Sequence, residues 1–149
     1  MQKEVSGFNP IGRKTKKIQL IWNELLGMKE CPYAYRWVFI FFGYSIRIHH
    51  FLRSDDKRYF HTHPWWFLTF VLRGSYTDVS PEGRDELKRF NFRYRKAEHA
   101  HYVDVPVGGC WTILLTGKPL NKWGFIVNGK LKRPLKYFHA FGHPPCEEQ

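Results

Sequence analysis

HTHPWW, residues 61–66, is the stretch that best indicates the fold, because it precedes an apolar run that ends at Gly74. Successive side chains of a β-strand point to opposite faces, so the two histidines of an H-x-H pair share one face. Their imidazoles then lie about 7 Å apart along the strand and can turn toward one transition metal. A third histidine would complete a site that keeps open positions for water or a substrate.

A second H-x-H pair follows about forty residues later, in the stretch 98–105. His99 and His101 share one face of that expected strand with apolar residues. Two such pairs, each opening a strand with an apolar inward face, favour metal binding. Histidines that serve only structure at strand ends are the alternative.

The chain as a whole predicts a mainly β fold in a single domain of 149 residues. Short strands separated by glycine and proline turns follow from residue 33 onward, which is typical of a barrel or sandwich. Asn128-Gly129 predicts a hairpin turn. One N-terminal helix is expected, since apolar residues between Ile18 and Leu26 recur at helical spacing.

We expect residues 1–12 to be a flexible N-terminus, and residues 13–149 to form a barrel with the N-terminal helix and a C-terminal tail packed on it. No apolar run is long enough to span a bilayer, and no signal peptide is recognised, so a soluble cytoplasmic protein is expected. The chain has three cysteines, Cys31, Cys110 and Cys146. Their odd number and unpaired spacing favour free thiols in a reducing compartment.

Four blocks of the sequence resemble the cupins, and more closely the small cupin-like proteins encoded by phages and prophages. They are IRIHHFLRSDD (46–56), HTHPWWFLTFVLRGSYTD (61–78), WTILLTGKPLNKWGF (111–125) and YFHAFGHPPC (137–146). The resemblance implies a single-domain jelly-roll barrel. It also implies a divalent transition metal, iron, zinc, manganese or nickel, held inside by His61, His63 and either His101 or His99.

One departure from the cupin pattern bears on the chemistry. Cupins place a glutamate four or five residues after the second histidine, where this chain has Phe67 and Leu68. The metal site is then either a three-histidine site or one completed by Asp78. Three histidines on iron(II) suit a dioxygenase, whereas on zinc they suit hydrolysis or isomerisation.

Other residues are candidates for substrate contacts. Tyr76 and Asp78 share a strand face and would act as an acid/base pair or support the metal ligands, unless they are strand-edge surface residues. Aromatic and arginine candidates would stack on a flat ligand or hold a carboxylate or phosphate, unless they are core or solvated surface residues. They are Trp65, Trp66, Trp111, Arg47 and Arg73.

Three functions remain open from the sequence. The formal net charge of +11 favours anionic partners. The first function is a metal-dependent enzyme acting on a small anionic molecule, and the second is a non-catalytic cupin that sequesters a nucleotide against host defence. The third is a basic protein that contacts nucleic acid through phosphates. No membrane partner is expected, and a homodimer stays open.

Overall fold

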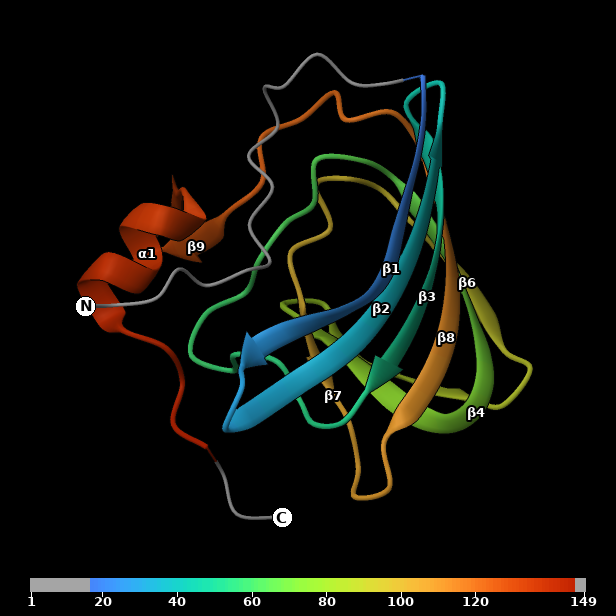
Figure 1. Cartoon of the computed structure of the whole chain (residues 1–149). Helices are drawn as coiled ribbons and strands as arrows, with labels where there is room; N and C mark the ends of the chain where they lie inside the picture. The colour runs from blue at the N-terminus through green and yellow to red at the C-terminus, as the bar shows by residue number, and fades with distance from the viewer. Residues whose placement is uncertain (1–16, 147–149) are drawn as a thin grey trace.

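The computed structural model describes residues 17–146 as a mainly β protein (Figure 1), which confirms the expected fold class. The strands are β1 (Ile18–Met28), β2 (Cys31–Phe41), β3 (Tyr44–Phe51), β4 (Phe67–Ser80), β5 (Gly83–Lys88), β6 (Phe92–Arg95), β7 (Tyr102–Asp104), β8 (Cys110–Thr116), β9 (Phe125–Val127) and β10 (Lys130–Lys132), and the helix is α1 (Pro134–Phe141). No helix among these residues is long and apolar enough to cross a membrane.

Strand β4 joins the two halves of the barrel. The main sheet has the order β1-β2-β3-β8-β4-β5, and β6 and β7 also pair with β4, all antiparallel. A register shift between Val71 and Arg73 lets β4 turn, so that its first part pairs with β6 and its second part with β5 and β7. Gly74 follows this bulge with φ +77, and a Cβ there would collide with the carbonyl oxygen of Gly109. A glycine is therefore required inside a continuous strand, where the sequence indicated a strand end.

The expected N-terminal helix is wrong, because residues 18–28 form the edge strand β1. A register shift between Ile21 and Glu24, with Asn23 at φ 48, interrupts the pairing of β1 with β2. An extra residue in a strand changes which side chains share a face, so a period of two is not kept across the bulge. The apolar positions on either side of it then match helical spacing by coincidence. The expected flexible segment 1–12 lies outside the described residues.

The two faces of the main sheet are unlike. Large apolar side chains form a row across the outer face, one from each paired strand, and they are Leu20, Phe39, Ile46, Leu115, Leu68 and Tyr94. The inner face instead carries buried polar side chains, which are Ser45, His49, Thr69, Thr112 and Thr116. Because these inner side chains are mostly small and polar, they do not fill the interior of the barrel, and a cavity remains.

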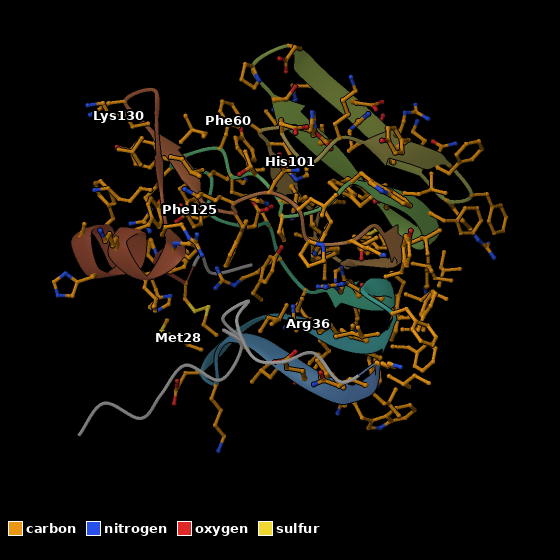
Figure 2. The ribbon with its side chains drawn as sticks, turned by 90° about the horizontal axis from the view of Figure 1, so that it is seen from above. Met28, Arg36, Phe60, His101, Phe125 and Lys130 are labelled. Carbon is orange, nitrogen blue, oxygen red and sulfur yellow. A yellow bond between two sulfur atoms is a disulfide. The ribbon has the colours of Figure 1, made fainter. Side chains whose placement is uncertain are left out.

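The dense core occupies only part of the molecule. One buried cluster, which includes Phe51, Leu87 and Val103, lies between β3, β5 and β7. A second cluster joins the β9–β10 hairpin to helix α1, where Tyr137 stacks on Phe125 with ring centroids 3.8 Å apart. Viewed from above, Phe125 lies toward that helix (Figure 2). The expected hairpin turn is confirmed, since Asn128 and Gly129, at φ 50 and 72, connect β9 and β10.

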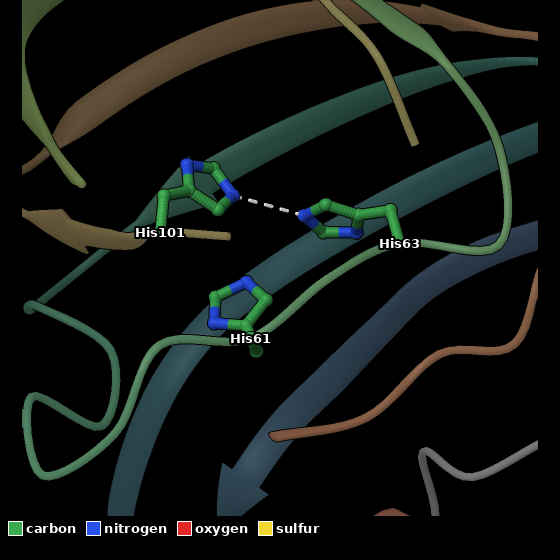
Figure 3. A group of neighbouring side chains, drawn as sticks. All are labelled: His61, His63 and His101. Carbon is green, nitrogen blue, oxygen red and sulfur yellow. Dashed lines mark hydrogen bonds between the residues drawn. The ribbon is translucent and has the colours of Figure 1, made fainter. Parts of the chain in front are cut away.

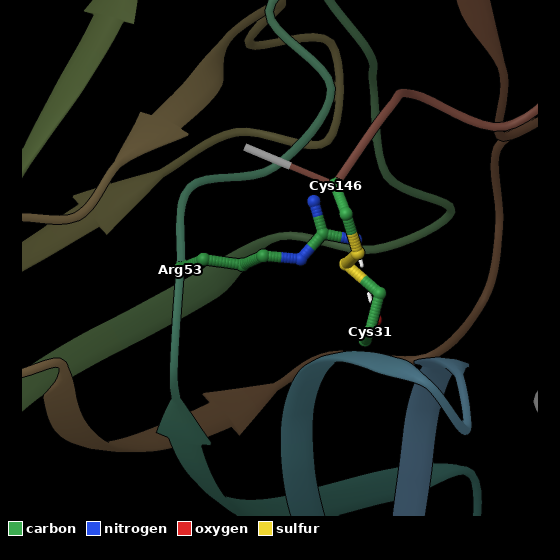
Figure 4. The surroundings of a disulfide bond; sticks show 3 residues. All are labelled: Cys31, Arg53 and Cys146. Atoms are coloured by element: carbon green, nitrogen blue, oxygen red, sulfur yellow. Dashed lines mark hydrogen bonds between the residues drawn. A yellow bond between two sulfur atoms is a disulfide. The ribbon is translucent and has the colours of Figure 1, made fainter. Parts of the chain in front are cut away.

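The expectation of three free thiols is wrong, because Cys31 and Cys146 form a disulfide (Figure 4). Their Cα atoms are 6.0 Å apart, and the bridge ties the segment after α1 to the start of β2. Arg53 lies beside it and donates from Nη2 to the carbonyl oxygen of Cys31 at 3.4 Å. Cys110 remains free and buried. The cysteines therefore no longer support a reducing compartment.

Candidate metal centre

Three histidines from two distant parts of the chain turn toward one another inside the barrel (Figure 3). The Nε2 atoms of His63 and His101 are 3.0 Å apart, and the His61 ring centroid lies 5.0 Å from that of His63 and 4.9 Å from that of His101. The structure thus brings together the first H-x-H pair and one histidine of the second.

Backbone pairing, and not a shared strand, positions His61 and His101. Each lies in an isolated bridge outside the named strands, in which His61 N donates to His101 O at 2.9 Å and His101 N donates to His61 O at 3.0 Å. The expectation that both H-x-H pairs stand on regular strands is wrong, since β4 begins at Phe67 and β7 at Tyr102. His61 and His101 are close because their backbones pair in this bridge, and not because both lie on regular strands.

Asp78 holds the outer side of this cluster. It is 2% exposed, and its carboxylate lies 2.9 Å from His101 Nδ1 and 2.8 Å from His99 Nε2. Arg95 Nε donates to the same carboxylate at 3.2 Å. Burial opposes the charge, but the hydrogen bonds from the two histidines outweigh it and hold the pKa of Asp78 well below its usual range. A charged Asp78 keeps the proton of His101 on Nδ1, so that its Nε2 lone pair points into the cluster.

The other two histidines of the cluster are neutral at pH 7. Burial lowers the pKa of His61 to about 3, and the neighbouring His101 adds to this effect. Burial also lowers the pKa of His63 well below its ordinary value, with His61 as the next cause. A neutral imidazole keeps a free lone pair, which is the form that binds metals.

The donor set fits a transition metal. Two nitrogens that bind one metal at right angles, with bonds of about 2.0–2.1 Å, lie about 3 Å apart. That separation matches His63 Nε2 and His101 Nε2. Three imidazole nitrogens with a carboxylate behind one of them is a known arrangement for such metals. Asp78, His99 and His101 form a second group close enough to share an ion. In that group Asp78 occupies His101 Nδ1, the nitrogen that faces away from the first cluster.

The three histidines border a cavity of about 910 Å³. Two of the predicted contact residues line it with them. Trp65 stacks on His63 at 4.9 Å between ring centroids, and the Arg47 guanidinium lies 4.6 Å above the same indole. Tyr76 also lines it, is 5% exposed, and has its pKa raised by burial. Its partner in the expected acid/base pair, Asp78, lies behind His101 and not among the lining residues.

The remaining predicted residues lie elsewhere. The Trp66 ring contacts Tyr94 at 5.9 Å, away from the lining of the large cavity. Arg73 and Trp111 line a separate pocket at the other face of the sheet, where Trp111 stacks on His50 at 4.2 Å. Three of the five residues expected to contact a ligand, Trp66, Arg73 and Trp111, therefore do not line the cavity beside the histidine cluster.

Some cavity residues were not predicted from the sequence. Arg36 on β2, His49 on β3 and Thr112 on β8 all line the large cavity. Register places them side by side, since His49 pairs with Arg36 on one flank and with Thr112 on the other. The sequence shows that Ser45, Arg47 and His49 share one strand face, but alternation with apolar residues favours a solvent-facing polar side, so only the structure reveals that this face points into the cavity.

Fold and site together define the class: a cupin-type jelly-roll barrel with a three-histidine candidate metal centre inside it. Solved structures of cupin-fold proteins resemble this chain. The iron(II) form of HppE matches with a TM-score of 0.53 at 11% identity over 68% of this chain. The DMSP lyase DddQ from Ruegeria pomeroyi matches with a TM-score of 0.53 at 14% identity over 69%. A variant of oxalate decarboxylase from Bacillus subtilis matches with a TM-score of 0.50 at 12% identity over 72%.

These likenesses concern the fold. The chain spans 57% of HppE, 57% of DddQ and 31% of the oxalate decarboxylase. Neither a protein-family model nor a curated protein matches the sequence. The chemistry of this chain must therefore be inferred from its own residues.

Proposed function

We propose that this chain is a metal-dependent cupin that binds a small anionic molecule beside a transition metal held by His61, His63 and His101. The single observation that carries the proposal is the convergence of these three imidazoles on one point at the wall of a large cavity. A metal bound there would supply a Lewis acid, or a site for oxygen chemistry in the case of iron(II).

The residues of the chain would perform the remaining tasks. Asp78 orients His101 by accepting a hydrogen bond from its Nδ1–H, which keeps the ligand nitrogen fixed. Trp65 and Phe67 contact the His63 ring from two sides, with centroids 4.9 Å away in both cases, and limit its rotation. The surrounding apolar rings also restrict water around the centre, which strengthens electrostatic interactions with a bound molecule.

Metal analysis tests this proposal directly. Protein purified without a histidine tag and dialysed against equimolar zinc, iron(II) or manganese should retain close to one equivalent of one of these metals. His63→Ala should lose it, whereas His139→Ala, which removes an exposed histidine of α1, should not. Wild-type protein without tight metal, or a His63→Ala variant that keeps the metal, would refute the proposal.

A further inference from the structure

The cavity wall opposite helix α1 contains buried polar groups that lack hydrogen-bond partners among residues 17–146. Both ring nitrogens of His49 and the hydroxyl of Thr112 are unpaired. His49 is 9% exposed and Thr112 is fully buried, and both line the cavity. An unpaired buried polar group lowers stability, so proteins rarely keep one unless it serves a function. Two such groups, adjacent across β3 and β8, leave hydrogen-bonding capacity open to a polar molecule in the cavity.

A guanidinium without a carboxylate partner lies on the same wall. Arg47 stands two residues before His49 on the inner face of β3, and its Nε donates to Ser45 Oγ at 2.9 Å. It forms no ion pair with a carboxylate among the described residues, whereas its neighbour Arg36 is paired with Glu24. Burial and the nearby Arg36 lower the pKa of Arg47 to about 9, so it stays charged at pH 7. The wall thus has an excess of positive charge.

Burial also sets the state of His49. Its pKa falls to about 3, mainly through burial and next through the charge of Arg47. The ring is therefore neutral at pH 7 and offers one N–H donor and one acceptor. Together with the Thr112 hydroxyl and the Nη groups of the guanidinium, it makes a set of donors that suits an oxyanion.

This wall lies close to the histidine cluster. The Arg47 guanidinium and the His63 ring both pack on the indole of Trp65, at 4.6 Å and 4.9 Å from it. The two groups are therefore no farther apart than the sum of these distances. Arg47 and His63 both line the large cavity, so one molecule in it can lie beside both.

We propose that Arg47, His49 and Thr112 form an oxyanion subsite that binds the carboxylate or phosphate group of the substrate while another part of it faces the metal centre. The inference deepens the proposed function. It rests on that function only for the claim that the substrate also faces a metal, because the subsite itself needs no metal. It assigns the substrate class as a small molecule with at least one terminal oxyanion.

Calorimetric titration with inorganic phosphate, and in parallel with acetate, tests the subsite in both zinc-loaded and chelator-treated protein. Two variants remove its donors: Arg47→Gln removes the guanidinium, and Thr112→Val replaces the hydroxyl by a methyl group of nearly the same shape. The first should weaken binding of the preferred anion at least about tenfold, and the second about three- to tenfold, in both metal states. Arg73→Gln, in the separate outer pocket, is the matched control and should bind like wild type.

A second readout separates a ligand site from a structural role. Thr112→Val replaces an unpaired hydroxyl by a methyl group, so it should raise the Tm of the ligand-free protein by about 2–4 °C while it weakens anion binding. A Thr112→Val variant that loses stability would show that the hydroxyl is structural and overturn its role in the subsite.

The outcomes distinguish this inference from the metal proposal. Anion binding by chelator-treated protein that depends on Arg47 supports the subsite even if no metal ever binds. Wild-type affinity in Arg47→Gln, or binding of neither anion at concentrations up to about 10 mM, about tenfold above a weak Kd of about 1 mM, overturns it whatever the metal analysis shows.

Discussion

Replacing Asp78 by asparagine should weaken metal binding, although Asp78 is not among the three proposed metal ligands. Its carboxylate lies 2.9 Å from His101 Nδ1, 2.8 Å from His99 Nε2 and 3.2 Å from Arg95 Nε. An asparagine of the same shape keeps one acceptor oxygen but removes the charge and adds a donor amide that faces the same N–H groups. Hydrogen bonds to a charged group contribute about 1.5–3 kcal/mol each. We therefore expect metal affinity to fall about 10- to 100-fold, as for other residues that orient a metal ligand.

Competition of the protein with a chromophoric chelator for zinc measures this change. Asp85→Asn is the matched control, because Asp85 also pairs with Arg95, at 2.6 Å, but does not contact the histidines. It should leave the zinc affinity within about threefold of wild type, which is the scale of a surface ion pair. Equal zinc affinity of Asp78→Asn and wild type, with both proteins folded, would refute the idea that Asp78 orients His101.

Three further changes test the fold and its electrostatics. Gly74→Ala should lower the free energy of unfolding by more than about 2 kcal/mol in urea titrations, since it adds a positive-φ penalty to a collision with backbone; an unchanged midpoint would contradict the bend of β4. Breaking the Cys31–Cys146 disulfide with Cys146→Ser should destabilise by up to about 5 kcal/mol, because it closes a loop with a sequence separation of 115; a reductant should then shift wild type but not the variant. His49 is neutral in the folded protein with a pKa of about 3 and binds a proton in the unfolded chain below about pH 6.5, so its own contribution to the loss of stability from pH 6.5 toward pH 3 is about 1.4 kcal/mol per unit; His61 and His63, whose pKa values burial also lowers, add to the loss in the same range. In His49→Gln that part of the pH dependence should be absent.

Local patterns in the sequence predicted the features that depend on neighbours along the chain. Asn128-Gly129 makes the expected turn, because both residues accept the positive φ that such a hairpin requires. Short strands between glycine and proline turns predicted the mainly β fold in the same way. The N-terminal helix failed where a bulge near Asn23 broke the period of two, since no local pattern announces a bulge. Helix α1 was missed because its apolar residues lie in a segment rich in proline and glycine.

The candidate metal centre was only partly predictable for a related reason. His61 and His63 were identified by their spacing, yet they lie in a non-strand segment that folds back against His101. The choice between His99 and His101 required their true positions, which put His101 in the cluster and His99 against the far side of Asp78. The sequence left open whether Asp78 completes the site or three histidines form it alone, and the structure places the Asp78 carboxylate beside His101 Nδ1 and His99 Nε2.

The sequence by itself determined that a serine, an arginine and a histidine share one face of β3, and that paired histidines precede a strand. Tertiary structure alone decided that these two features share a cavity. Sheet register sets such distances: Asp78 lies opposite Val103 because β4 pairs with β7, and this pairing brings its carboxylate to His101. Register between distant strands depends on how whole faces pack together, and therefore no short segment of the chain contains that information.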